Sequence, residues 1–117
     1  MEERFRDRSL SAEIRTKDLL GRMTIREKIG QIVKLDGFQS YERNSRGEYS
    51  LTREYCETVE RWPIGSLYGL LRADWWTTRD WETGVPPERM TDVVNLFQKH
   101  CLDHSRLGIP LYLAEEA

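Results

Sequence analysis

Hydrophobic residues recur at three- and four-residue spacing in four parts of the chain, which predicts four helices. The expected helices cover residues 12–23, a segment that begins at Ile25, residues 52–62 and residues 86–104. Ser11 can cap the first helix, and Thr24 with Glu27 forms a capping box for the second. The residues expected to face a core are Ile14, Leu19, Leu20, Met23, Ile25, Ile29, Ile32, Tyr55, Val59, Trp62, Met90, Val93, Val94, Phe97, Cys101 and Leu102.

Two apolar runs predict buried strands. Residues 64–71 and 111–114 are apolar along most of their length, which is typical of parallel strands covered on both faces. Residues 32–35 alternate like a short strand, so the end of the second helix stays open. A strand, a helix and a further strand in this order predict a parallel crossover and an α/β fold.

The remaining segments are expected to be loops. Residues 1–10 are a charged lead-in, residues 37–50 are a surface loop, and residues 72–85 are a loop rich in tryptophan and charge. We find no internal repeat and no flexible linker. The sequence stops directly after the last expected strand, whose next edge would be uncovered, so we expect a truncated domain.

Composition narrows the class of partner. The chain has 117 residues, enough for one domain, and its 18 basic and 20 acidic residues are interleaved, with a net charge of −2. Nucleic acid and membrane are therefore not expected partners. The charged N-terminus carries no export signal, which favours the cytoplasm. Cys56 and Cys101 match no metal or redox spacing and are expected to be reduced, buried thiols.

Three landmarks in order carry a family resemblance. They are Arg22-Met23-Thr24 followed by Glu27-Lys28-Ile29-Gly30-Gln31, then Ile64-Gly65-Ser66-Leu67, then Arg106-Leu107-Gly108-Ile109-Pro110. From about residue 9 onward, this set resembles the N-terminal part of glycoside hydrolase family 3. The resemblance implies an incomplete (β/α)8 TIM-type barrel with only its first few elements, since a whole barrel needs about 250 residues. Residues 1–23 would be a lead-in and helix, and residues 24–117 the truncated start of the barrel domain.

The same resemblance implies a function. Family 3 enzymes are β-glucosidase-like hydrolases that cleave terminal β-linked sugars with retention of configuration and need no cofactor. Their nucleophile and acid/base lie downstream of the part matched here, so we assign no catalytic residue and expect the isolated chain to be inactive. The expected partners are a carbohydrate substrate and the remainder of the barrel. The alternatives are a non-catalytic carbohydrate-binding or interaction remnant, and a truncated product without activity of its own.

Four residues are candidates for sugar binding. Glu116 matches by spacing the family's acidic residue that binds sugar hydroxyls, although many members have aspartate there, and Glu115 is expected to be structural. Arg72, Asp74 and Trp75 follow a predicted strand and could reach the same rim, where aromatic faces stack on sugars and charged groups bind hydroxyls. An equally weighted alternative is a loop anchored by its tryptophans with an internal Arg72–Asp74 pair.

The remaining candidate residues give less support for a functional site. Trp81 and Glu82 are expected to be structural. His100 and His104 are four residues apart on a predicted helix and could bind a metal, but no third ligand accompanies them, so we predict no metal site.

Overall fold

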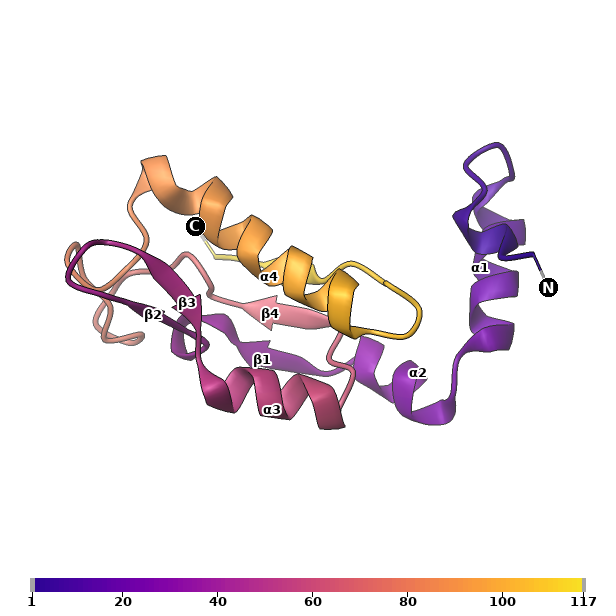
Figure 1. Cartoon of the computed structure of the whole chain (residues 1–117), viewed down its shortest axis with the longest axis horizontal. Coiled ribbons are helices and arrows are strands. Elements are labelled where there is room, and N and C mark those ends of the chain that lie inside the picture. The colour runs from indigo at the N-terminus through magenta and orange to yellow at the C-terminus, as the bar shows by residue number, and fades with distance from the viewer. Residues whose placement is uncertain (1, 117) are drawn as a thin grey trace.

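A three-stranded parallel sheet covered on one side by two helices forms the centre of the computed structural model, which describes residues 2–116 (Figure 1). The chain begins with the 3₁₀ turn η1 (Arg4–Arg6) and the helices α1 (Ala12–Arg22) and α2 (Ile25–Gln31). In order there follow β1 (Lys34–Asp36), η2 (Gly37–Gln39), β2 (Tyr41–Arg43), β3 (Tyr49–Leu51), α3 (Arg53–Arg61), β4 (Ser66–Tyr68), η3 (Pro87–Arg89), α4 (Met90–His104) and β5 (Tyr112–Ala114).

The strand order in the sheet is β1-β4-β5, and both neighbouring pairs are parallel. Leu35, Leu67 and Leu113 occupy the same register row across the sheet. The predicted parallel pairing of the two apolar segments is therefore confirmed. The predicted strand over 64–71 is too long, because Gly69 turns the chain with a φ of +63°, in the left-handed region that favours glycine.

The helix starts follow the predicted capping. The Ser11 and Thr24 side chains accept from the backbone N–H groups of Ile14 and Glu27, and the Glu27 carboxylate accepts from the Thr24 N–H at 2.7 Å. The second helix does not turn its isoleucines inward, since Ile25 is 74% exposed, Ile32 is 85% exposed and Ile29 is half exposed. Gly30 instead lies directly against Pro63 and forms one of the contacts between α2 and the rest of the fold.

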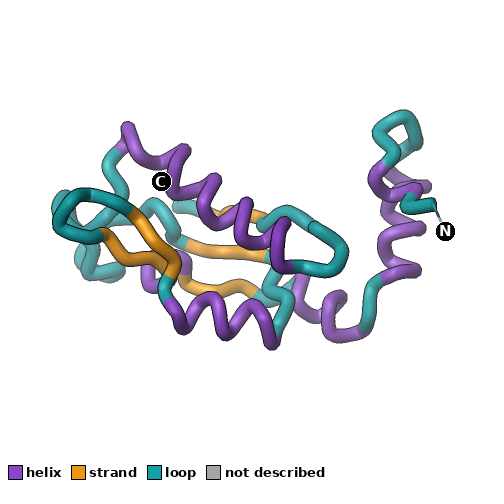
Figure 2. Tube along the Cα trace, in the orientation of Figure 1, coloured by secondary structure: helices purple, strands orange, loops and turns teal. Residues whose placement is uncertain are grey.

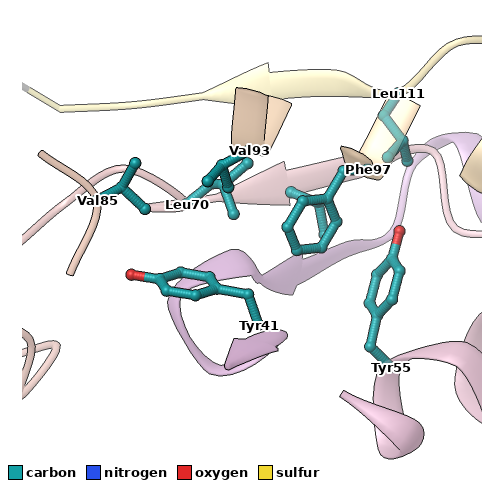
Figure 3. Packing of buried hydrophobic residues seen from close by; sticks show 8 residues of the cluster. Tyr41, Tyr55, Leu70, Val85, Val93, Phe97 and Leu111 are labelled. Atoms are coloured by element: carbon teal, nitrogen blue, oxygen red, sulfur yellow. The ribbon is translucent and has the colours of Figure 1, made fainter. Parts of the chain in front are cut away.

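The helices α3 and α4 lie over one face of the sheet (Figure 2), and the core is packed between them and the strands. The central leucines of the three strands meet Tyr55 of α3 and Val93 and Phe97 of α4 there. Phe97 is fully buried in the middle of this cluster, and its ring meets that of Tyr55 edge-on at 5.0 Å (Figure 3). The apolar spacing in residues 86–104 thus predicted the buried face of α4 at Val93 and Phe97, but Leu102, which was also expected to face the core, is 45% exposed.

The predicted surface loop over 37–50 is wrong. Here β2 and β3 form an antiparallel hairpin in which Tyr41 pairs with Leu51 and is only 1% exposed. Gly47 closes the turn with a φ of +78°. Of the six residues in these two strands only Tyr41 is buried, and charged residues lie within and between the strands, so no apolar alternation marked them in the sequence.

Three further expectations about burial need correction. Trp62 is 52% exposed and carries the Arg26 guanidinium on its ring instead of entering the core. Ile14 and Leu20 of α1 are also exposed; Met23 is buried, in a small separate cluster with Phe5 and Leu107. Cys56 and Cys101 are free thiols, as expected, but they are half-buried rather than buried.

The opposite face of the sheet is uncovered within residues 2–116. Lys34, Asp36 and Tyr112 are exposed on it, and Ser66 and Tyr68 are partly exposed. The three strands form an open sheet, and the described part of the chain contains no closed barrel. None of its helices is long and apolar enough to cross a membrane.

Candidate functional site

The carboxyl ends of the three parallel strands meet at one edge of the sheet. Asp36, Tyr68 and Ala114 end β1, β4 and β5, and the register places them side by side. The loop after β4 and the segment after β5 therefore both leave from this edge. Parallel sheets build their sites at such edges because the strand ends bring distant segments together.

Arg72 connects these two segments. Its Nη1 donates to the Tyr68 hydroxyl at 3.1 Å and to Glu116 Oε2 at 2.9 Å, while its Nε pairs with Asp74. The Arg72 and Asp74 side chains are each about one quarter exposed, and Glu116 is open to solvent. The structure thus brings together three of the four predicted sugar-binding residues, and adds Tyr68. We call Tyr68, Arg72, Asp74 and Glu116 the strand-end cluster.

The strand-end cluster holds its carboxylates in the charged form. The pKa of Glu116 is lowered, first by its hydrogen bond with the Tyr68 hydroxyl and then by Arg72, with Lys34 adding a further positive charge. The pKa of Asp74 is lowered by the Thr77 backbone N–H and then by Arg72. The pKa of Tyr68 is raised, because the Glu116 carboxylate stabilises its protonated hydroxyl. The site therefore offers ionised acceptors beside fixed donors.

Aromatic side chains pack against the strand-end cluster. The Trp76 ring meets the rings of Phe38 at 5.1 Å and Tyr68 at 6.1 Å, and the Arg72 guanidinium lies 5.3 Å from the Trp76 ring centre. Lys34 Nζ lies 4.0 Å from the ring centre of Tyr68. Trp76, although 44% exposed, thus makes contacts of the anchoring kind that we considered for the loop tryptophans, and the internal Arg72–Asp74 pair of the same alternative is also present.

Trp75, the fourth predicted residue, is placed differently. Its side chain is 88% exposed, in the same loop as Arg72 and Asp74. The expectation for Trp81 is wrong, since its 86% exposed side chain does not pack as a structural tryptophan. Glu115 accepts from the Leu71 backbone N–H at 3.1 Å and so fastens β5 to the loop after β4, as its structural assignment anticipated.

Sequence reasoning missed Tyr68 and Lys34 as site residues. Both lie on the uncovered face of the sheet, two residues apart in register, and flank the guanidinium and carboxylate groups at the strand ends. The alternation of Ser66 and Tyr68 with the buried Leu67 could have indicated this side. The prediction of a strand buried on both faces left no exposed face on which Tyr68 could lie.

A separate cavity of about 340 Å³ lies at the other end of the strands. Ile64 and Leu111, which precede β4 and β5, line it together with Tyr55, His100 and Cys101. The rings of His100 and His104 stack at 4.2 Å, and burial followed by His104 lowers the pKa of His100. Within residues 2–116, no group of three or more His, Cys, Asp or Glu side chains is arranged to hold a metal ion.

Comparisons with models of known protein families and with curated proteins give no match for this chain. A role for the strand-end cluster therefore rests on its geometry and chemistry.

Proposed function

We propose that the chain supplies the sugar-binding edge of a retaining, β-glucosidase-like glycoside hydrolase built on a (β/α)8 barrel. The observation that carries this proposal is the Arg72 guanidinium, which joins Tyr68, Asp74 and Glu116 where two adjacent parallel strands end. Barrel enzymes place substrate at this end of their strands. The three parallel strands and the helices on one face support the same architecture.

The groups suit the hydroxyls of a sugar. A hydroxyl can donate to the ionised Glu116 or Asp74 carboxylate and can accept from Arg72 or Lys34. Such charge-assisted hydrogen bonds are about twice as strong as neutral ones. A sugar ring with several hydroxyls can use several of these groups at once, which favours binding of a carbohydrate over a ligand with one polar group.

The chemistry of the same groups favours binding over proton transfer. A retaining glycosidase needs one carboxylate as nucleophile and one carboxylic acid that keeps its proton near neutral pH. The pKa values of Glu116 and Asp74 are both lowered, so neither suits the acid role. We therefore propose that the nucleophile and the acid/base come from sequence beyond this chain, and that the enzyme works in the cytoplasm.

A non-catalytic carbohydrate-binding protein is the second candidate. The ionised state of both carboxylates favours it, because binding needs no protonated acid. The two functions differ in turnover, since a binding protein would hold a β-glucoside without cleaving it.

Binding by the 117-residue chain tests the shared part of the proposal. We expect glucose and an aryl β-glucoside to shift the NMR signals of Arg72 and the Glu116 backbone, and Glu116→Gln to weaken this binding about tenfold, as expected for loss of a charged hydrogen bond. Glu57→Gln is the matched control, because Glu57 lies on the exposed side of α3. Equal affinities of wild type and Glu116→Gln would refute the site.

Measuring hydrolysis tests the proposal that this chain binds the sugar but does not supply the catalytic groups. We expect no hydrolysis of the aryl β-glucoside by the chain alone. Hydrolysis above a matched blank, lost in Glu116→Ala, would show that the chain carries its own catalytic group and would overturn this part of the proposal.

A further inference from the structure

The loop between β4 and η3 contains the same turn twice. Asp74-Trp75-Trp76-Thr77 and Asp80-Trp81-Glu82-Thr83 share the pattern Asp-Trp-X-Thr, and the second begins six residues after the first. The expectation that the chain contains no internal repeat is therefore wrong for this loop. The repeat is short, but both copies fold into the same hydrogen-bonded turn.

Both turns are closed by the same contacts. Asp74 Oδ1 accepts from the N–H groups of residues 76 and 77 at 3.0 and 2.9 Å, and the Asp74 N–H donates to Thr77 Oγ1 at 3.1 Å. Asp80 Oδ1 accepts from the N–H groups of residues 82 and 83 at 2.9 and 2.8 Å, and the Asp80 N–H donates to Thr83 Oγ1 at 3.1 Å. Each turn therefore holds the tryptophan at its second position on a fixed backbone.

Arg79 fastens the two turns to the rest of the fold. Its Nη2 donates to the carbonyls of Phe38 and Tyr41 at 2.7 and 2.9 Å, and its Nη1 donates to the Thr83 carbonyl at 3.1 Å. Thr77 is buried at the base of the first turn. The loop therefore has a rigid frame at the end of the molecule far from α1 (Figure 1).

The two turns leave the side chains of Trp75 and Trp81 exposed to solvent. Trp75 and Trp81 are 88% and 86% exposed, although a tryptophan has the largest apolar surface of any side chain and is normally well buried. Both border an open hollow of about 580 Å³. Its apolar wall includes Leu71, Val85, Pro86, Pro87 and Met90.

We propose that the two Asp-Trp-X-Thr turns form a binding platform for a β-linked oligosaccharide, on which Trp75 and Trp81 stack against successive parts of the glycan. This inference rests on the proposed function and extends it from a single sugar to a chain of sugars. Rigid indole faces match the apolar faces of sugar rings and lose little conformational entropy on binding.

Two observations favour a glycan over a proline-rich peptide, which could also stack on exposed tryptophans. First, the hydrogen bonds of the Asp80 carboxylate within the described residues fall on Oδ1, and Asp80 lines the same hollow as Trp81, so its Oδ2 can accept from hydroxyl donors there. A proline-rich backbone offers few such donors. Second, Asp74 lines the hollow and also pairs with Arg72, so the platform is continuous with the strand-end cluster. A glycan can therefore reach from one to the other.

The test compares binding of glucose, cellotetraose and laminaritetraose to the chain by calorimetry and tryptophan fluorescence. We expect a tetraose to bind more tightly than glucose. Trp75→Ala and Trp81→Ala should each weaken tetraose binding about tenfold, the effect of losing the apolar contact of one indole face. Trp62→Ala is the matched control, since Trp62 is a half-exposed tryptophan at the end of α3. Circular dichroism of each variant checks the fold.

The outcomes separate the platform from the strand-end site. If Glu116→Gln leaves glucose binding unchanged while the tryptophan variants lose tetraose binding, the platform stands and the proposed function fails. If both tryptophan variants bind tetraose like the wild type, the platform is refuted whatever the result for Glu116. Binding of a proline-rich peptide without binding of either tetraose also refutes it.

Discussion

Arg106 binds Glu27 across 79 residues of sequence. Its Nε and Nη2 donate to the two carboxylate oxygens at 3.0 and 2.6 Å, and its Nη2 also donates to the Arg22 carbonyl at 2.8 Å. The Glu27 side chain is only 15% exposed because it also completes the capping box with Thr24. One carboxylate therefore starts α2 and ties it to the segment that leads into β5.

Loss of this double role should destabilise the fold. We expect Glu27→Gln to lower the free energy of unfolding by about 1–2 kcal/mol, since the amide accepts more weakly and carries no charge. Urea unfolding followed by circular dichroism measures this. Glu57→Gln removes an exposed pair with Arg53 within α3 and should cost less than about 0.5 kcal/mol. Equal losses in the two variants would contradict the role of Glu27.

Low pH should lower the free energy of unfolding by protonating the Glu27 carboxylate. Arg106 is the first cause that lowers the pKa of Glu27, and Arg22 lowers the pKa of Asp18 in the same way. A carboxyl with a depressed folded-state pKa contributes stability that is complete above its ordinary pKa and is lost as the pH falls through the folded-state value. The free energy of unfolding should therefore fall as the pH drops below the ordinary pKa values of these two carboxyl groups, and Glu27→Gln should flatten this dependence. An equally steep dependence in the variant would contradict the assignment to Glu27.

The sequence predicted those parts of the fold that depend on local patterns. The caps at Ser11 and Thr24 need residues within one helical turn, and the apolar spacing of α4 reports its own buried face. The hairpin at residues 41–51 escaped prediction, because its charged side chains stay mostly exposed and only Tyr41 is buried, by contacts with distant groups. Arg79 meets the Tyr41 carbonyl, and the Tyr49 hydroxyl donates to the Gly84 carbonyl at 2.8 Å.

The candidate site, like the fold, could be predicted from the sequence only in part. Arg72, Asp74 and Glu116 could be grouped because each follows a strand end, and parallel strands collect their ends at one edge. The alternation around Leu67 could have indicated the face on which Tyr68 lies, but not that this face is uncovered, and the exposure of Trp81 could not be read from the sequence. The exposure of Tyr68 depends on which face of the sheet is covered, and that of Trp81 on hydrogen bonds within the turn.

Two glycines give opposite predictions. A Cβ at Gly30 would lie 1.8 Å from the Pro63 carbonyl oxygen, and the Gly30 carbonyl accepts from the Gly65 N–H at 2.8 Å. We expect Gly30→Ala to lower the free energy of unfolding by about 3 kcal/mol or more, because α2 would have to move away from this backbone. Thermal unfolding measures the change.

Gly21 is the matched control within α1, since a Cβ there meets nothing within 4 Å. Gly21→Ala should raise the free energy of unfolding by about 0.5–1 kcal/mol through helix propensity alone. A loss in Gly21→Ala as large as that in Gly30→Ala would mean that the contact with Pro63 does not decide the outcome.

Arg72 should control the charge of the strand-end cluster, and the repeated turn provides an internal control. In Arg72→Gln we expect the pKa of Glu116 to rise toward its ordinary value, although the Tyr68 hydroxyl still lowers it. The pKa of Asp74 should rise only in part, because the Thr77 N–H, its first cause of stabilisation, remains. Carbon-13 NMR titration of the carboxyl groups measures both changes.

Asp80 occupies the equivalent position of the second turn, where Thr83 and Glu82 lower its pKa without an arginine. Its titration should therefore be the same in wild type and Arg72→Gln. If the pKa of Asp80 moved together with those of Asp74 and Glu116, the substitution would have disturbed the whole loop. If only Asp74 and Glu116 moved, the guanidinium would contribute directly to the ionised state of both carboxylates, beside the Tyr68 hydroxyl and the Thr77 N–H.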